Sequence, residues 1–390
     1  MKRIISVALL SATTSLMALG GEQAFLYKDP RIMGMGGANV AVGAYSTAIF
    51  SNPAGLANIK KEHGYVVDIL SIGATVSAQT QEFIDDLDAA GDNSDNIEDV
   101  INKYSGDVFN VEVNNYSSVS KNSDMFAWSV GILAATDVST IVHGNGSSSG
   151  APLEVSGRAY GGILLGGAKS YSTKVGEVDI GVGLKYIQQT SYEGPLYVAD
   201  LQGDDAMQTL QDKYEKKSSG FGLDLGINYK PFQSSMWHPA FGLSILNIGA
   251  MSMDDNFGGQ PTTVNVGASI TPEVKFLDKL VLAVDYVDIF NENKVRIYTF
   301  DEGNDTKSYV DYTDSDFMKR LRLGAGFGLI DGQYFSTQVN VGLYQGAYTA
   351  GLDMEITAIK LNFATYQEQI GTGSVDIPDR RYMAQIGIGW

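Results

Sequence analysis

Cysteine is absent from the 390-residue sequence, and proline and histidine are scarce, with nine and three residues. The absence of cysteine excludes disulfides and fits an exported protein that relies on sheet closure instead. Basic residues are also few, since 27 Lys and Arg face 45 Asp and Glu, for a formal net charge of −18. This balance argues against a nucleic-acid partner and against simple attraction to anionic lipid head groups.

Long apolar runs are missing beyond the N-terminus. Met1-Lys2-Arg3 precedes an apolar stretch from Ile4 to Leu19, and Ala18 and Gly20 are small. These features predict a secretory signal peptide over residues 1–20, cleaved after Gly20. A single-pass anchor is the alternative, but the run is short and interrupted compared with the roughly 20 apolar residues of a spanning helix. If the chain is in a membrane, it therefore crosses with strands.

The sequence is rich in glycine and tyrosine, and it contains segments in which apolar and polar residues strictly alternate. It contains 45 Gly and 21 Tyr, and its mean hydropathy is close to zero. In Phe221–Tyr229, large apolar residues alternate with Gly, Asp and Asn, which places the two sets on opposite faces of a strand. The last segment, Tyr382–Trp390, repeats this pattern. An apolar face and a polar face on successive strands are typical of an outer-membrane β-barrel with its apolar face toward lipid.

We predict an all-β fold, a transmembrane antiparallel β-barrel of about 14 strands that spans residues 63–390. A soluble β-sandwich is the alternative fold. The final residue, Trp390, is the expected signal to the barrel-assembly machinery, and outer-membrane lipid is the expected surrounding. The predicted strands lie near 63–76, 109–119, 124–138, 153–171, 176–192, 218–230, 239–253, 260–271, 278–290, 317–330, 333–343, 346–356, 358–368 and 380–390.

The connections between these strands alternate in length. Those after even-numbered strands are short, as at Lys121-Asn122-Ser123 and Asp331-Gly332. Those after odd-numbered strands are mostly long, at 77–108, 139–152, 193–217, 291–316 and 369–379. Bacterial barrels have short periplasmic turns and longer outer loops. The pattern therefore favours a barrel over a sandwich and places the segment before the first strand on the periplasmic side.

Two outer loops have helical rather than strand-like spacing. In the first, Phe83 and Leu87 are followed by Ile97, Val100, Ile101 and Tyr104; in the third, the pattern is Met207, Leu210 and Tyr214. We expect short amphipathic helices near the barrel mouth. They either cap the rim or form an apolar ledge on which a ligand first lands.

About forty residues before the first strand, 21–62, do not alternate. They contain Met33-Gly34-Met35-Gly36-Gly37-Ala38 and, within about twenty residues, Asn52-Pro53-Ala54-Gly55-Leu56. Pro53 disfavours a helical conformation at Asn52 and can begin a helical turn. A compact segment of this length is too long for a linker and predicts a plug folded into the lumen. We call residues 21–62 the hatch.

These two motifs resemble the N-terminal region of the FadL/TodX-like outer-membrane transport proteins. The conjugal-transfer TraF-like branch is more similar still through Phe221–Tyr229, Asn247-Ile248-Gly249 and Arg380–Trp390, and PorV-type secretion barrels are also similar. The resemblance covers most of the mature chain, but only the Asn-Pro-Ala-Gly-Leu region is specific. It implies a fourteen-stranded barrel in which a hydrophobic ligand enters from outside and leaves past a hatch or through a lateral opening. It implies that the hatch residues are Asn52, Pro53, Ala54, Gly55 and Leu56. The chain departs from FadL in that its first outer loop is the largest, so the family's ligand groove is not carried over.

Motifs for other chemistry are incomplete. The glycine run from Gly34 lacks the third glycine and the βαβ context of a dinucleotide site. An acidic stretch counted as a calcium loop from Asp92 places Lys103 where the bidentate Glu belongs, and Asp301–Asp305 is likewise read as a solvated acidic segment. Weak divalent-ion binding at the cell surface stays open for the first stretch. His63, His143 and His238 have no partner at metal-ligand spacing. Because His143 lies near Asn145 and Ser147–Ser149, a barrel-type hydrolase that uses this histidine is still an open alternative. No catalytic residue, metal or cofactor is predicted.

Seven charged residues fall on the predicted lumen face, where they pair with each other, line a wet path or anchor the hatch. They are Lys185, Asp224, Asp285, Asp353, Glu355, Lys360 and Arg381. Because inward positions are mostly glycine or polar, ligand contacts have to come from the hatch. The candidates are Phe25, Ile32, Met33, Met35, Ile49, Phe50 and Leu56.

Three functions remain open from the sequence. The first is passive diffusion of small hydrophobic or amphipathic molecules past the hatch of an outer-membrane barrel in a Gram-negative bacterium. The second is an assembly or interaction protein associated with conjugation or secretion. The third is a general porin, against which the hatch argues. A continuous apolar pocket between hatch and wall would favour transport, and a lumen filled by charged pairs would favour a scaffold.

Overall fold

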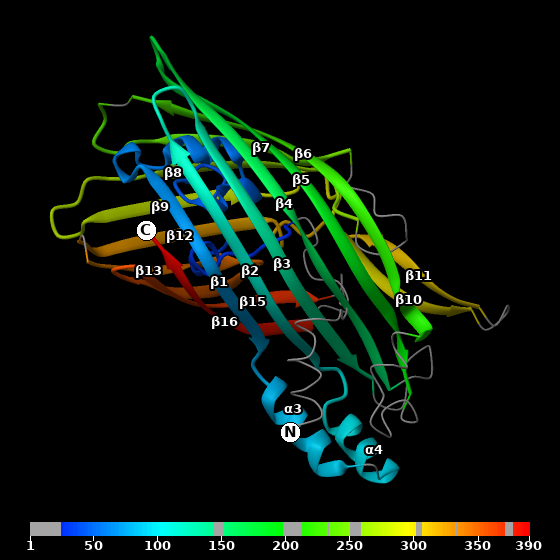
Figure 1. Cartoon of the computed structure of the whole chain (residues 1–390). Coiled ribbons are helices and arrows are strands. Elements are labelled where there is room, and N and C mark those ends of the chain that lie inside the picture. Colours follow the sequence, from blue (N-terminus) through cyan, green and yellow to red (C-terminus); the bar gives the residue numbers. More distant parts are fainter. Residues whose placement is uncertain are drawn as a thin grey trace.

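The computed structural model describes residues 25–91, 93–143, 152–197, 212–232, 234–249, 259–301, 306–332, 334–370 and 377–390. Fourteen antiparallel strands close into one barrel, as predicted, in the order β1-β16-β15-β14-β13-β12-β9-β8-β7-β6-β5-β4-β3-β2 (Figure 1). The predicted signal peptide, residues 1–20, lies outside the described residues. Among the described residues, no helix has the length and apolar character that a membrane crossing requires.

The barrel strands follow the predicted segments closely, because each keeps the period-2 alternation of its sequence. Their bounds are β1 Tyr65–Ser77, β2 Val108–Asn122, β3 Ala127–Val142, β4 Leu153–Thr173, β5 Gly176–Leu196, β6 Lys216–Pro231, β7 Ala240–Ile248, β8 Thr263–Ile270, β9 Lys279–Tyr286, β12 Leu321–Asp331, β13 Phe335–Tyr344, β14 Ala347–Ile356, β15 Ile359–Ile370 and β16 Ile377–Gly389.

Four strands are at least three residues shorter than predicted, and one predicted loop contains strands. β7 ends at Ile248 rather than 253, β8 spans Thr263–Ile270 rather than 260–271, β9 ends at Tyr286 rather than 290, and β12 begins at Leu321 rather than 317. The loop predicted over 291–316 contains the hairpin β10 (Lys294–Asp301) and β11 (Thr306–Thr313), which forms its own two-stranded sheet. Eight cross-strand pairs hold this hairpin. It was missed because the segment was assigned as one long connection.

The outer face of the barrel is apolar. Phe221, Leu225 and Ile227 of β6 are 77, 40 and 43 % exposed, whereas Asp224 and Asn228 of the same strand are fully buried. The neighbouring strand β5 presents Ile180, Val182 and Leu184 outward in the same way. The described strands thus carry an exposed apolar surface that water disfavours and hydrocarbon accepts.

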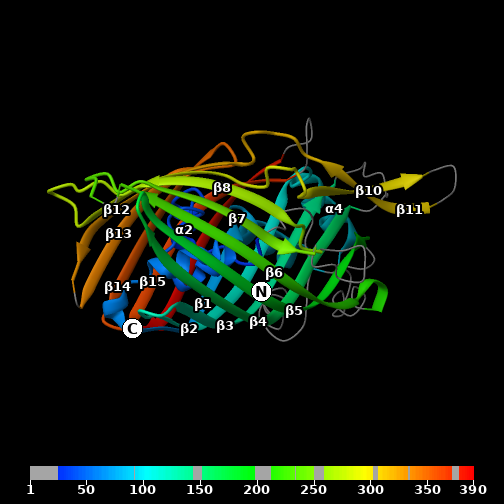
Figure 2. The same ribbon diagram turned by 90° about the horizontal axis from the view of Figure 1, so that it is seen from above.

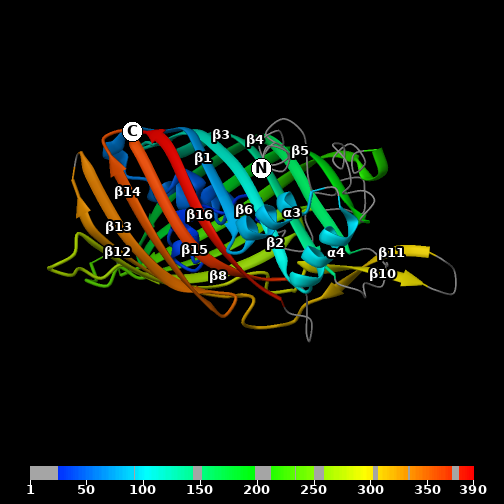
Figure 3. The same ribbon diagram turned by 90° about the horizontal axis from the view of Figure 1, so that it is seen from below.

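Long and short connections lie at opposite ends of the barrel. The helices α3 (Thr80–Ala90) and α4 (Ser94–Lys103) and the β10–β11 hairpin project from one end, and the C-terminus lies at the other (Figures 2 and 3). Phe83 stacks on Phe109 of β2, with ring centroids 4.2 Å apart. The apolar faces of α3 and α4 join a buried cluster with the ends of β2–β5, including Ile97, Ile101 and Tyr192.

The hatch lies inside the barrel (Figure 1). It consists of the short helix α2 (Pro30–Gly34) and the 3₁₀ turns η1 (Ser46–Phe50), η2 (Pro53–Asn58) and η3 (Lys61–His63). Pro53 begins η2, and the Asn52 side chain caps it by accepting a hydrogen bond from the Ala54 N–H at 3.1 Å. The predicted helical turn at Pro53 is therefore present.

Candidate functional site: the hatch and its seat

Glycines on the inner wall let the hatch backbone approach the strands. A Cβ added at Gly226 of β6 would lie 2.0 Å from Asn52 Oδ1, and one at Gly181 of β5 would lie 2.2 Å from Ala54 N. Farther around the wall, a Cβ at Gly324 of β12 would lie 2.3 Å from Met35 O. Real Cβ atoms do not come this close, so only glycine fits at these wall positions. The hatch therefore lies close to the wall along an arc that runs from β5 and β6 to β12.

Hydrogen bonds from several strands fix the hatch backbone. The Asp285 carboxylate of β9 accepts from the backbone N–H groups of Asn39 and Val40 at 2.6 and 2.7 Å. Thr349 of β14 donates to Gly34 O at 2.7 Å, and Tyr160 of β4 donates to Leu26 O at 2.7 Å. Bonds with a charged partner are among the stronger hydrogen bonds in proteins. The position of the hatch is thus set from at least three sides of the barrel.

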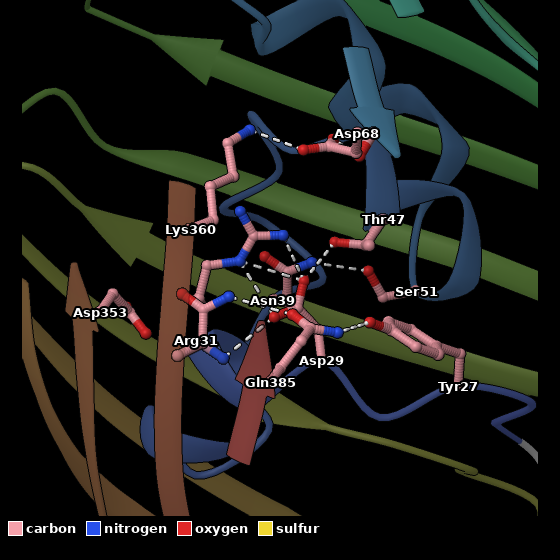
Figure 4. Close-up of polar contacts among 12 residues, drawn as sticks. Tyr27, Asp29, Arg31, Asn39, Thr47, Ser51, Asp68, Asp353, Lys360 and Gln385 are labelled. Atoms are coloured by element: carbon pink, nitrogen blue, oxygen red, sulfur yellow. Dashed lines mark hydrogen bonds and ion pairs between the residues drawn. The ribbon is translucent and has the colours of Figure 1, made fainter. Parts of the chain in front are cut away.

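Within the hatch, one carboxylate joins two segments. Asp29 caps α2 through the Arg31 N–H at 2.9 Å, pairs with the Arg31 guanidinium at 2.6 Å and accepts from the Thr47 hydroxyl at 2.7 Å (Figure 4). Burial alone would lower the pKa of Arg31, but Asp29 and Asp68 hold that pKa above its ordinary value. Arg31 therefore stays charged, and its guanidinium also lies 4.5 Å from the centroid of the Tyr45 ring.

The barrel seam where β1 meets β16 also contacts the hatch. Asp68 of β1 accepts from the Ser46 hydroxyl at 2.7 Å and pairs with Lys360 of β15 at 2.6 Å. Gln385 of β16 donates to the Tyr27 hydroxyl at 2.5 Å. Figure 4 shows the Asp68–Lys360 pair and the Gln385–Tyr27 contact on two sides of Asp29 and Arg31. Polar side chains of the hatch therefore have wall partners, as buried polar groups require.

The seven predicted lumen charges lie on the inner side of their strands. Lys185 pairs with Asp224 at 2.9 Å, and Arg381 pairs with Asp379 at 2.6 Å. Asp353 accepts from Asn340 at 2.6 Å. Glu355 is in register with Lys360, but the Lys360 ammonium turns to Asp68 instead. Most of these charges have partners in the wall itself, and Asp285 is the one that bonds the hatch backbone.

Apolar side chains of the hatch pack against inward-facing apolar patches of the wall. Phe50 meets Tyr116 of β2 edge-to-face at 4.8 Å, and Ile49 joins the same buried cluster as Leu133 and Leu164. Leu56 packs with Ala127 and Ala168, and Met35 with Val281 and Ala283. Sequence alternation did not predict these patches, because Tyr116, Leu133 and Leu164 stand among glycine and polar inward residues.

A small cavity of about 40 Å³ lies between the hatch and the wall. Four of the predicted ligand-contact residues line it, namely Phe25, Ile32, Met33 and Phe50. Met35 and Ile49 do not, because they pack against the wall glycines Gly324 and Gly166. The wall contributes Val287, Arg322 and Tyr344, which the sequence did not mark out as candidates. A second space of about 10 Å³ adjoins Arg31, Asp68 and Lys360. The second space is about the size that one water needs, and the first is a few times larger.

The histidines and the acidic stretch form no metal site in the described residues, where no three potential ligands converge. His143 lies 3.3 Å from Glu154, and His238 lies 3.1 Å from Glu273. The described residues do not include Asp92, the Asn145–Ser149 neighbours of His143, residues 302–305, Met207 or Leu210. Tyr214 lies in a short helical turn and packs on the cluster of α3 and α4.

A family model described as "F plasmid transfer operon, TraF, protein" matches residues 132–341, more than half of the chain. The chain belongs to this TraF family. The matched range begins in β3 and ends in β13, so it contains most of the wall glycines but not the hatch. No curated protein sequence matches the chain.

Solved structures share the fold of this TraF-family chain. A monoaromatic hydrocarbon channel, the TodX deltaS2S3 mutant, is 10 % identical with a TM-score of 0.56, and the match covers 93 % of this chain and 98 % of that one. The TodX deltaS2 mutant is 10 % identical with a TM-score of 0.51, covering 93 % and 97 %. At this identity the likeness establishes a common barrel architecture, which agrees with the FadL/TodX resemblance of the sequence.

Proposed function

We propose that this TraF-family chain is an outer-membrane barrel that passes small hydrophobic or amphipathic molecules by passive diffusion past its N-terminal hatch. The observation that carries the proposal is the small gap between the hatch and the wall, whose exposed surface is mostly apolar. Phe25, Ile32, Met33 and Phe50 line it from the hatch beside Lys28 and Asp29, and Val287, Arg322 and Tyr344 line it from the wall. Apolar lining with a few fixed polar groups is the usual character of a site for apolar ligands.

The described state is closed, so passage requires the hatch to move. A gap of about 40 Å³ is far smaller than the several hundred Å³ that a drug-sized ligand occupies. The hydrogen bonds that the Asn39 and Val40 N–H groups donate to Asp285 are the contacts whose loss would free the middle of the hatch. The shared fold with monoaromatic hydrocarbon channels supports a ligand of similar size and polarity. No bond is made or broken in this function, and no cofactor takes part.

The test is uptake of a hydrophobic probe through a hatch variant. Asn52→Ala with Pro53→Ala removes the cap and the preset turn of η2, while leaving the strands unchanged. We expect radiolabelled toluene and octanoate to enter cells that carry the wild-type barrel several-fold faster than cells without it. The hatch variant is expected to change that rate.

Two controls make the result interpretable. Heat-modifiable mobility on gels checks that the variant barrel is still folded. A hydrophilic sugar of similar mass should enter at the same slow rate with and without the barrel. Equal toluene uptake with and without the barrel would contradict the transport proposal, and unchanged uptake in the folded variant would leave the hatch a structural element only.

A second candidate is an assembly or interaction protein of the outer membrane. The described lumen is closely filled, and buried pairs such as Lys185–Asp224 serve the wall rather than a path. The family description refers to plasmid transfer. If this role holds, deletion of the gene lowers the frequency of plasmid transfer from donor cells. Expression of the hatch variant in the deletion strain then restores that frequency, and toluene uptake stays unchanged.

A further inference from the structure

A hollow of about 890 Å³ lies on the outer surface of the barrel, on the side away from the lumen. Its lining comes from β7, β8, β9, β12, β13 and β14, which are consecutive in the sheet. Leu282, Val284 and Tyr348 are 37, 41 and 64 % exposed at this surface. The hollow is therefore separate from the gap at the hatch.

The strand register resolves the hollow into two rows of outward side chains. In one row, hydrogen-bonded neighbours place Phe241, Ala268, Val284, Leu323, Leu343 and Tyr348 side by side. In the other, Ile270, Leu282, Ala325, Val341 and Ala350 follow in the same way. At a strand spacing of about 4.8 Å, six strands give a trough about 24 Å long. Alanines make part of its floor, and Phe241 and Tyr348 stand at its two ends.

The hatch explains why the wall is hollow here. On the inner face of the same strands, a Cβ at Gly342 would lie 2.6 Å from Gly36 N, and one at Gly351 would lie 2.9 Å from Gly34 Cα. Without side chains between them, these strands approach the hatch backbone closely. The inner glycines and the outer alanines together leave space on the outer side.

A cation stands at one end of the trough. The Arg380 guanidinium of β16 lies 4.0 Å from the Tyr348 ring centroid and donates to Tyr348 O at 2.8 Å. Its other polar partner among the described residues is Gln367 Oε1, at 3.5 Å. The adjacent Asp379 and Arg381 pair with each other on the lumen side. Arg380 is thus placed at the trough end without a described carboxylate to neutralise it.

We propose that the trough binds one acyl chain of lipid A, with a lipid A phosphate on Arg380. Tyr348 and Arg380 lie near the loop end of β14 and β16, which the proposed outer-membrane placement puts at the outer leaflet. Aromatic and basic residues are typical of the membrane interface, and arginine suits phosphate through its planar donor fork. The apolar rows below Tyr348 offer the chain a fitted surface rather than a smooth wall. The proposal rests on the outer-membrane placement but not on transport.

The experiment is a titration of the delipidated full-length barrel in non-ionic detergent with purified lipid A, followed by native mass spectrometry. Arg380→Gln removes the cation, and Ala325→Phe fills the trough floor from the lipid side. We expect one tightly bound lipid A per wild-type barrel, and at least tenfold weaker binding in each variant.

Matched controls use the same changes elsewhere on the outer surface. Lys121→Gln removes another cation that lies over a tyrosine, 4.2 Å from the Tyr65 ring centroid. Ala134→Phe adds the same bulk at an exposed outward position of β3. Both controls should bind lipid A within twofold of the wild type.

Three results would overturn the proposal. Equal binding by all five proteins would make the lipid a non-specific annulus. Equal binding of phosphatidylcholine or phosphatidylglycerol would remove the preference for lipid A. A dimer in the wild type that Ala325→Phe dissociates would make the trough an interface between copies of this chain. Recovery of the barrel outside the outer-membrane fraction would instead remove the placement on which the proposal rests.

Discussion

At the scale of single residues, glycine decides where the hatch can sit. The wall glycines replace side chains that would collide with the hatch backbone, and Asp285 then holds that backbone with two hydrogen bonds. Both N–H groups donate to the same carboxylate oxygen, Oδ2 of Asp285. The seat is therefore made from the smallest residue and from one well-placed acceptor.

Gly226→Ala should displace the hatch around Asn52, because the added Cβ would lie 2.0 Å from Asn52 Oδ1. Overpacking of this kind costs about 1–3 kcal/mol. We expect faster toluene uptake or greater protease sensitivity of the hatch, with normal heat-modifiable mobility. Gly167→Ala is the matched control, because its Cβ would have its nearest neighbour at 3.9 Å. A hatch that is as protected in Gly226→Ala as in the control would contradict the seat.

Asp224→Asn should destabilise the barrel, because it leaves the ammonium of Lys185 buried without its ion-pair partner. Breaking a buried pair from one side costs about 3–5 kcal/mol. The measurement is the urea midpoint of unfolding in detergent. The double variant Lys185→Met with Asp224→Leu should recover much of the loss, since apolar residues can replace a buried pair. A single variant as stable as the wild type would show that the pair contributes little.

At the scale of elements, α3 and α4 pack against the strand ends rather than filling the lumen. Their apolar faces are buried with β2–β5, and the described parts form a cluster around Phe83, Tyr104 and Phe109. Of the two roles expected for these helices, this packing favours a cap on the rim. An apolar ledge would require the same side chains to be exposed.

Phe83→Ala should unfold the α3–α4 unit locally and leave the barrel intact. The variant loses a ring stacked at 4.2 Å on Phe109, and truncation of a buried phenylalanine costs about 3–5 kcal/mol. Hydrogen exchange should become fast across 80–103 and remain slow in β6 and β12. Asp85→Ala, at an exposed position of the same helix, is the control. Loss of slow exchange throughout the barrel would mean that the helices and the barrel fold as one unit.

At the scale of the whole molecule, the separation of long and short connections gives the barrel a direction. An epitope inserted at Gly91, which has a positive φ and no neighbour within 4 Å of an added Cβ, should be labelled on intact cells. The same epitope after Asp124, in the turn between β2 and β3, should be labelled only after permeabilisation. The reverse result would mean that the barrel has the opposite orientation in the membrane and that Arg380 does not lie at the outer leaflet.

Alternation along the sequence determined the fourteen barrel strands, because a strand in a two-faced wall repeats every two residues whatever its partners. The spacing of Pro53 after Asn52 likewise determined the capped turn of the hatch. The hairpin of β10 and β11 was missed because its segment was assigned as one long loop. Only the tertiary structure decided which glycine faces which hatch atom. It also decided that Asp285 rather than Asp224 holds the hatch, and that the outer wall is hollow beside Arg380. These features depend on contacts between residues up to a few hundred positions apart, set by strand register and barrel closure, and no local pattern records them.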